Sequence, residues 1–259
     1  MASAKNIGGW VYRLCFKKIH TITSTYSIGK AFNERLPMFN DKLLLFFWGL
    51  DFDILNKKAS LTEFTKTFLN SIKESDIFIF YPRSIIRITR FDLLIEAMNI
   101  IKYDLPKNTR IIIWHGNVTD SEYEHELKAK VNSYGLDTYI RFIKHPYLPD
   151  RDIYEIWKRT DFSINIIESD GLSSQFMEAL IFEKPILLSG ISTYTPFNDS
   201  YNLKLDFVEN NVNDVVKGLK YMFSCYGEYN REILTKRREF ALKHFNFEEN
   251  VNILLRRLQ

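Results

Sequence analysis

Residues 166–180 read IIESDGLSSQFMEAL and indicate a passage from a buried strand, through a turn, into a helix. Ile166 and Ile167 end the strand, Asp170 and Gly171 form the turn, and the helix begins near residues 172–174. Ligands of parallel sheets bind at such strand ends, and the free amides of a helix N-terminus attract anions. Gly171 has no Cβ, so a ligand can approach the backbone closely. A plain helix cap, made by Ser173 or Asp170, explains the same residues equally well.

Glu178 favours a binding site over a plain cap. It stands on a helix whose other side chains are apolar almost all round, so the helix is predicted to be buried. A buried carboxylate is costly unless something hydrogen-bonds to it. Asp170 precedes Glu178 by eight residues, so we expect both carboxylates to border one cleft. A nucleotide sugar suits that cleft, with its diphosphate at the amides and its ribose and sugar hydroxyls on the two carboxylates.

Outward from this stretch, short apolar runs alternate with segments of helical period. Such alternation, with several runs apolar throughout, predicts an α/β fold with a doubly wound parallel sheet. The predicted strands are 20–25, 43–48, 77–81, 110–114, 139–143, 162–167 and 185–189. The predicted helices are 61–72, 91–101, 120–134, 150–159, 172–183, 213–226 and 228–257. A boundary is expected near residues 50–60, and the two strands before it form a partial β-α-β unit, too small for a stable sheet alone.

Two further strand ends carry polar side chains. Arg83, Arg87 and Arg90 follow the strand 77–81, and arginine binds phosphate through paired hydrogen bonds. A solvated basic loop is the alternative for any one of these arginines. Ile143, Lys144 and His145 follow the strand 139–143, and the prolines behind them suggest a rigid wall for a nucleobase. His145 and His115 are open to a structural role as much as to a catalytic one.

Composition excludes several classes of protein. The 259 residues, 46% hydrophobic and 26% charged, are those of an ordinary globular protein with a substantial core. A net charge of +3 gives no reason to expect nucleic acid as a partner. No run approaches the ~20 apolar residues of a membrane span. Cys15 and Cys225 lie far apart, which suggests free thiols in the cytoplasm. Walker, G-x-G-x-x-G, H-E-x-x-H and C-x-x-C motifs are absent, and no metal site is expected.

Tyr139–Pro185 resembles the C-terminal, donor-binding domain of the GT-B fold glycosyltransferases, in the retaining group 1 type. The resemblance rests on the carboxylates of Asp170 and Glu178, separated by seven residues, and on Glu183-Lys184-Pro185. Pro82-Arg83 is similar to the glycine-arginine pair of the family. The phosphate-binding lysine of the family maps near Thr89, a departure for which Arg87 or Arg90 is the expected substitute.

The resemblance implies a Rossmann-like domain over residues 56–240. It also implies a remnant of the acceptor domain with a hinge over 1–55, and a helix over 241–259 that crosses back onto that remnant. The implied activity is transfer of a sugar, with retention, from a nucleotide diphosphate sugar to a hydroxyl of a glycan or lipid-linked saccharide. Neither metal nor cofactor is implied.

The resemblance also implies roles for individual residues. Asp170, Glu178 and Arg83 form the catalytic set, with Asp170 on the sugar hydroxyls and Glu178 on the ribose. Arg83, with Arg87 or Arg90, holds the diphosphate together with the amides of Gly171, Leu172 and Ser173. Ile143, Lys144 and His145 flank the base.

Other interpretations stay open at this level. The chain is also consistent with a nucleotide-sugar-binding module without catalysis of its own, with a regulatory subunit that binds no ligand, or with a hydrolytic or epimerising relative. Basic pairs such as Arg256-Arg257 are consistent with attachment to the inner face of the membrane, or with plain solvated surface. A second copy of the chain is a further possible partner.

Overall fold

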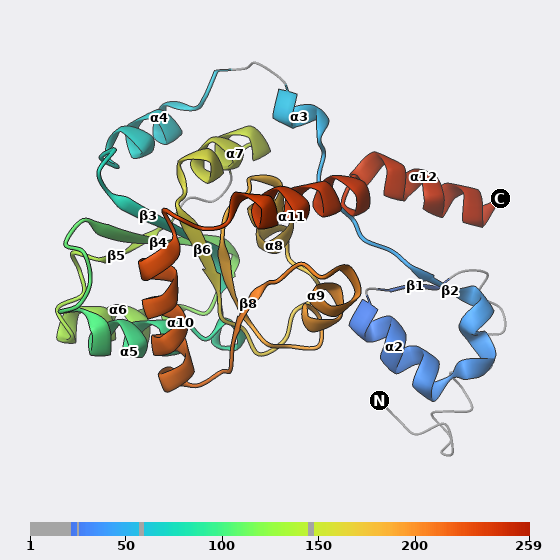
Figure 1. Ribbon diagram of the computed structural model, residues 1–259, viewed down its shortest axis with the longest axis horizontal. Helices are drawn as coiled ribbons and strands as arrows, with labels where there is room; N and C mark the ends of the chain where they lie inside the picture. The colour runs from blue at the N-terminus through green and yellow to red at the C-terminus, as the bar shows by residue number, and fades with distance from the viewer. Residues whose placement is uncertain (1–21, 25, 57–59, 145–147) are drawn as a thin grey trace. The chain divides into compact units, whose positions relative to one another are not determined.

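The computed structural model describes residues 22–24, 26–56, 60–144 and 148–259. The chain forms two compact units. Met1–Asp51 and Lys243–Gln259 make up one unit, and Phe52–Leu242 make up the other. The second unit contains the predicted sheet (Figure 1).

The sheet has six strands in the order β5-β4-β3-β6-β7-β8, and every neighbouring pair is parallel. Its strands are β3 (Ile77–Ile85), β4 (Thr109–Thr119), β5 (Ile140–Ile143), β6 (Phe162–Asn165), β7 (Ile186–Ser189) and β8 (Asp206–Val208). The chain builds outward from β3 to β5 and then returns to the centre with β6. The two central strands, β3 and β6, therefore flank the point at which the strand order reverses, where doubly wound sheets bind ligands. The predicted fold class is confirmed.

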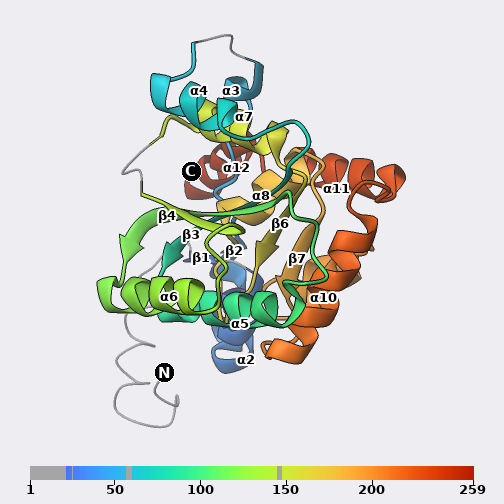
Figure 2. The same ribbon diagram turned by 90° about the vertical axis from the view of Figure 1, so that its left-hand side faces the viewer.

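Helices cover both faces of this sheet, as Figures 1 and 2 show. One face carries α5 (Phe91–Ile101), α6 (Ser121–Ser133) and α10 (Val212–Cys225). The other carries α4 (Glu63–Asn70), α7 (Asp150–Arg159) and α8 (Ser174–Ile181). Shorter helices are α3 (Asp53–Asn56), η2 (Arg87–Thr89) and α9 (Thr195–Tyr201), and α11 (Arg231–His244) follows α10.

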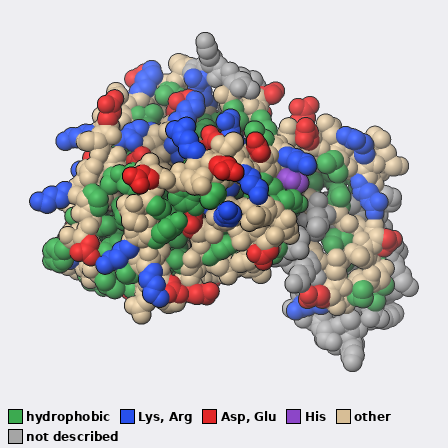
Figure 3. All heavy atoms as spheres, viewed as in Figure 1, with side chains coloured by type: hydrophobic (Ala, Val, Ile, Leu, Met, Phe, Trp, Pro, Cys, Tyr) green, Lys and Arg blue, Asp and Glu red, His purple; other side chains and the backbone are tan. Residues whose placement is uncertain are grey.

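Both faces of the sheet bury apolar side chains, which explains the nearly unbroken apolar strands. On the first face, Ile79, Ile111 and Ile164 pack with residues of α5 such as Leu94 in one continuous core. On the second face, Trp157 of α7 meets the ring of Phe80 edge to face, with ring centroids 5.3 Å apart. Outside the core, charged side chains of both signs are spread over the face seen in Figure 3.

The smaller unit contains the predicted β-α-β piece. Strand β1 (Ile22–Ser24) pairs in parallel with β2 (Leu43–Leu45), and α2 (Tyr26–Arg35) and the 3-10 helix η1 (Pro37–Lys42) connect them. Strand β2 is shorter than the predicted strand 43–48.

The prediction of one helix over 228–257 is wrong, because the structure has two separate helices there, α11 and α12 (Phe247–Leu258). At the break, Leu50 and Phe245 join through a backbone hydrogen bond of 2.8 Å, and Asn246 caps α12. Gly49 has φ +75°, and a Cβ there would lie 2.4 Å from the carbonyl oxygen of Phe245. This close approach of two backbones requires glycine and pulls residues 245–246 out of helical geometry.

The sequence analysis also did not predict several short elements, among them β8 and α9. The prediction that Arg83 follows its strand is wrong as well, since β3 continues to Ile85. The additional residues of β3 pair with β4, and Arg83 lies opposite His115 in this pairing.

Candidate functional site

Arg83 and Asp170 meet at the point where the strand order reverses. Arg83 is on the carboxyl-terminal part of β3, and Asp170 is in the loop that follows β6. The Nη2 atom of Arg83 lies 3.3 Å from Oδ2 of Asp170, and their side chains are only 16% and 9% exposed. The tertiary structure therefore brings together two of the three side chains predicted to be catalytic.

Asp170 is fixed by further hydrogen bonds. The amide of Gly171 donates to Oδ1 over 2.8 Å, and the hydroxyl of Tyr194 donates to Oδ2. Thr193 donates to the main-chain oxygen of Asp170 over 2.6 Å. Tyr194 and Thr193 come from the segment between β7 and α9, so the two loops hold each other in place.

Ser173 is the N-cap of α8, as one of the two sequence interpretations proposed. Its Oγ accepts a hydrogen bond of 3.3 Å from the amide of Phe176. The amide of Gly171 donates a hydrogen bond to Asp170. The amides of Leu172 and Ser173 have no hydrogen-bond partner among the described residues. These two amides stand at the positive end of the α8 dipole, which suits an anionic group.

Leu172 has a left-handed backbone, with φ at +87°. A non-glycine residue in such a conformation costs on the order of 1–3 kcal/mol, and it persists only where the surrounding structure imposes it. Here the imposing contacts are the Asp170 network before Leu172 and the Ser173 cap after it. The strained residue therefore lies between the two fixed parts of the loop.

Glu178 is buried on α8 and belongs to a different network. Its Oε2 accepts a hydrogen bond of 2.7 Å from Nε1 of Trp157. Burial raises the pKa of Glu178 to about 7, against the opposing effect of the Trp157 hydrogen bond, and Asp150 adds to the increase. The hydrogen-bond partner of the buried Glu178 is thus the indole of Trp157 on α7. The sequence pattern did not predict this partner. Among the described residues, no hydrogen bond or ion pair joins Glu178 to Arg83 or Asp170.

The three arginines do not form one cluster. Arg87 makes two hydrogen bonds to Glu126 of α6, of 2.7 and 3.0 Å. Arg90 pairs with Asp92 at 3.0 Å and with Glu168 at 2.9 Å. The hydrogen bonds that each guanidinium donates to these carboxylates raise its pKa. Arg90 reaches the loop before Asp170 through Glu168, whereas Arg87 is directed at α6.

Thr89, at the place of the lysine of the family, has a structural role. Its side chain is buried, and Oγ1 donates to the main-chain oxygens of Ser84 and Ile86. These bonds close the turn between β3 and α5.

The structure describes only part of the segment that was predicted to flank the nucleobase. Ile143 is the last residue of β5 and pairs with Trp114 of β4. Lys144 is exposed, and His145 lies outside the described residues. His115, next to Arg83 in the sheet, is buried, and neither of its ring nitrogens has a hydrogen-bond partner among the described residues. Oε1 of Glu124 lies 3.6 Å from Nε2 of His115, and burial lowers the pKa of His115.

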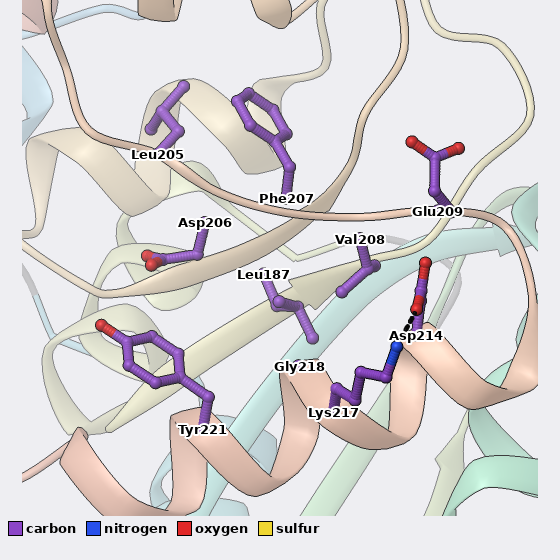
Figure 4. A pocket seen from close by; sticks show the side chains of 10 residues that line it. All are labelled: Leu187, Leu205, Asp206, Phe207, Val208, Glu209, Asp214, Lys217, Gly218 and Tyr221. Carbon is purple, nitrogen blue, oxygen red and sulfur yellow. Dashed lines mark hydrogen bonds and ion pairs between the residues drawn. The ribbon is translucent and has the colours of Figure 1, made fainter.

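A pocket of about 530 Å³ lies elsewhere, at the β8 edge of the sheet (Figure 4). Leu187 of β7 and Gly218 of α10 form part of its wall, and Asp214 and Lys217 pair with each other at its rim. It contains none of the predicted site residues. We place the candidate site at Arg83 and Asp170 because polar groups converge there. The described residues bring no three of His, Cys, Asp or Glu together as metal ligands.

Residues 63–239 match the family model described as "Glycosyl transferases group 1". The chain belongs to the group 1 glycosyltransferases. The matched residues include all six strands of the large sheet, together with Arg83, Asp170 and Glu178. No curated protein sequence matches the chain.

Several solved structures share the fold. Anabaena HepE, crystallised with UDP and glucose, superposes with a TM-score of 0.75 at 12% identity over 96% of this chain. A glycosyltransferase from Rickettsia africae gives a TM-score of 0.75 at 16% identity over 92% of it. Sucrose-phosphate synthase from Thermosynechococcus elongatus gives 0.73 at 14% identity over 100% of it.

This group 1 glycosyltransferase chain spans less than two thirds of those structures. It covers 66% of HepE, 64% of the Rickettsia protein and 63% of the synthase. The shared part contains the GT-B carboxyl-terminal half. Among the described residues, no helix has both the length and the apolar surface that crossing a membrane requires.

Proposed function

We propose that this protein binds a nucleotide diphosphate sugar and transfers its sugar, with retention, to a hydroxyl of a glycan or a lipid-linked saccharide. The observation that carries the proposal is the pairing of Arg83 with Asp170 beside the α8 N-terminus, at the reversal of strand order. The family supports the reaction class. The UDP, glucose and UDP-glucose in the HepE structures support a nucleotide sugar as donor.

The diphosphate would bind between Arg83 and the amides of Leu172 and Ser173. A guanidinium makes paired hydrogen bonds to phosphate, and the helix dipole adds a partial positive charge. Arg90, near the same loop through Glu168, would supply further positive potential. Arg87 is less suited, because Glu126 and Asp120 neutralise it beside α6.

The rest of the donor would extend to either side of the diphosphate. Asp170 would accept a sugar hydroxyl, and Glu178 would bind the ribose. The base would lie along Ile143 and Lys144, at the end of β5. In the transfer step, the bond from the anomeric carbon to the phosphate oxygen breaks. A bond to the acceptor oxygen forms on the same face, and the hydroxyl proton leaves with the departing diphosphate.

Electrostatic stabilisation of the leaving diphosphate would supply most of the rate acceleration. Preorganised donors around a developing charge contribute several kcal/mol in a water-poor site. Arg83 and the two amides are such donors, so the proposed reaction uses neither a metal nor a cofactor. As part of the same proposal, the protein works in the cytoplasm, on the inner face of the membrane when its acceptor is lipid-linked.

A binding module without catalysis is the second candidate. It is consistent with a site whose groups, Arg83, Asp170 and the amides before α8, are all assigned to the donor and none to an acceptor. Release of sugar or its transfer to an acceptor by the purified chain would support an enzyme. Donor binding without turnover would support the module.

The decisive experiment is calorimetric titration with UDP, GDP and TDP and their hexose conjugates. For the ligand that binds, Arg83→Ala should weaken affinity about 10- to 100-fold, as expected for loss of charged hydrogen bonds. Arg110→Ala is the matched control, since Arg110 also pairs with an aspartate, Asp76, at 3.6 Å, and lies towards the amino-terminal end of β4. Absence of binding by the wild type, or equal affinity of Arg83→Ala and wild type, would refute the proposal.

A further inference from the structure

Tyr194 lies at the centre of the hydrogen bonds around Asp170. It is fully buried between β7 and α9, and its ring packs on Phe176 of α8, with centroids 4.9 Å apart. Its hydroxyl contacts Asp170 Oδ2, lies 3.0 Å from Nδ2 of Asn165 and lies 3.2 Å from Oγ of Ser173. One phenol therefore joins β6, the loop after it and the N-cap residue of α8.

The direction of each of these hydrogen bonds follows from the chemistry of the groups. Asn165 can only donate through Nδ2, so the Tyr194 oxygen accepts from it. Asp170, as a carboxylate, can only accept, so the single phenol proton points to Oδ2. Ser173 must then donate to Tyr194, because the phenol proton is already engaged. Burial and the Asp170 charge raise the pKa of Tyr194, which keeps that proton on the phenol.

Counting the hydrogen bonds that Asp170 accepts leaves one acceptor position on its carboxylate without a partner among the described residues. Each carboxylate oxygen has about two lone-pair positions. Oδ2 is engaged by Tyr194 and Arg83, and Oδ1 by the amide of Gly171. Among the described residues no other donor forms a hydrogen bond to Oδ1, so its second lone-pair position is available to one external donor. Rotation of the carboxylate would break the contacts to Tyr194 and Gly171 together.

We propose that Tyr194 is a positioning residue, which holds Asp170 so that Oδ1 accepts a single hydroxyl of the transferred sugar. The inference rests on the proposed function and adds to it the origin of sugar recognition. Tyr194 itself touches neither the sugar nor the diphosphate. Its removal should therefore affect the nucleotide sugar and spare the bare nucleoside diphosphate.

The test compares the affinities of UDP and UDP-glucose, or the corresponding pair identified by the titration panel. For Tyr194→Phe, we expect the affinity for UDP to stay within about twofold of the wild-type value. The affinity for UDP-glucose should fall about tenfold, as for the loss of one hydrogen bond to a charged group. In a turnover assay, the same variant should lower kcat/KM for the nucleotide sugar by at least the same factor.

Tyr229→Phe is a matched control. The Tyr229 hydroxyl donates to Asp206, and that carboxylate pairs with Arg237 at 3.4 Å, so the same three residue types meet away from the site. This variant loses a similar hydrogen bond and should bind UDP and UDP-glucose like the wild type. A merely structural role of Tyr194 would make the two variants behave alike.

A double-mutant cycle separates positioning from loss of stability. Asp170→Asn should weaken UDP-glucose and spare UDP, and Tyr194→Phe in that background should change the UDP-glucose affinity less than twofold further. If Tyr194→Phe does not fold, Asp170→Asn still tests the single-hydroxyl contact with the same two ligands. Equal weakening of both ligands, or none, would overturn the inference while leaving nucleotide binding in place. Wild-type protein that binds no ligand of the panel would instead overturn the proposed function.

Discussion

The indole nitrogen of Trp157 lies 2.7 Å from Oε2 of Glu178, and both side chains are buried between α7 and α8. Trp157 is the only hydrogen-bond partner of this carboxyl group among the described residues, and the helix that carries the carboxyl group is mostly apolar. The hydrogen bond only partly offsets the cost of burial, because the pKa of Glu178 remains raised, at about 7. Glu178 is therefore a group whose protonation links pH to both stability and the proposed ribose contact.

The first prediction concerns pH and stability. The pKa of Glu178 is about 7 in the folded protein and about 4.5 when exposed, so the folded state holds an extra proton between these values. Stability from this group is fully present below pH 4.5 and is lost as the pH rises to 7. The loss is on the order of 3 kcal/mol. Urea unfolding of wild type and Glu178→Gln at pH 5 and pH 8 should show the difference, with the variant relatively more stable at pH 8. Parallel pH profiles would contradict it.

A second prediction concerns Trp157→Phe. The substitution removes the hydrogen bond that lowers the pKa of Glu178, so that pKa should rise above 7. The pH range over which stability falls should extend upward by the same amount. The variant should also lose on the order of 1–3 kcal/mol at neutral pH, because the carboxyl is left without its partner. Unfolding as a function of pH measures both effects. Trp48→Phe, at a side chain 68% exposed, is the control and should change neither.

The Tyr81 hydroxyl gives a third prediction. It accepts a hydrogen bond of 2.9 Å from the amide of Ile166 and lies 3.1 Å from the carbonyl oxygen of Thr89. Tyr81→Phe leaves a buried amide unsatisfied and should cost about 1–3 kcal/mol of unfolding free energy. Chemical denaturation measures this loss. Tyr103→Phe, at a ring 89% exposed, should cost nothing measurable, and an equal loss in both variants would argue against the contact.

Gly218 leads to a fourth prediction, on packing of α10 against the sheet. A Cβ at this position would lie 2.5 Å from Cγ1 of Val208 and 2.9 Å from Cδ1 of Leu187. Gly218→Ala should therefore lower the free energy of unfolding by about 1–3 kcal/mol through overpacking. At Gly227 a Cβ would meet nothing within 4 Å, so Gly227→Ala is the control. A Gly218→Ala variant as stable as wild type would show that α10 shifts without cost.

The fold was largely accessible from the sequence, because apolar runs of strand length and helical periods are local properties. The strands 77–81, 110–114 and 162–167 each contain or overlap an observed strand. The predicted bounds of strands and helices were wrong where contacts with a distant part of the chain determined the structure. Arg83 extends β3 because β4 pairs with it, and the long C-terminal helix breaks where Leu50 bonds to Phe245.

The candidate site was accessible only in part. Asp170 and Glu178 were found from their positions around a strand end, and Ser173 from its capping chemistry. Arg87 and Arg90 were grouped with Arg83 because they are neighbours in the sequence. Acidic side chains from α6 and from the loop after β6 pair with them instead, and no local pattern reports those distant charges.

By itself the sequence determined the parallel sheet, and it located Asp170 in the loop after a strand and Glu178 on the helix that follows. Only the tertiary structure decided their partners. Tyr194 reaches Asp170 across 24 residues, and Trp157 reaches Glu178 across 21. The reason is physical: hydrophobic periodicity specifies which face of an element is buried, whereas a buried polar group takes its partner from whatever packing brings within about 3 Å.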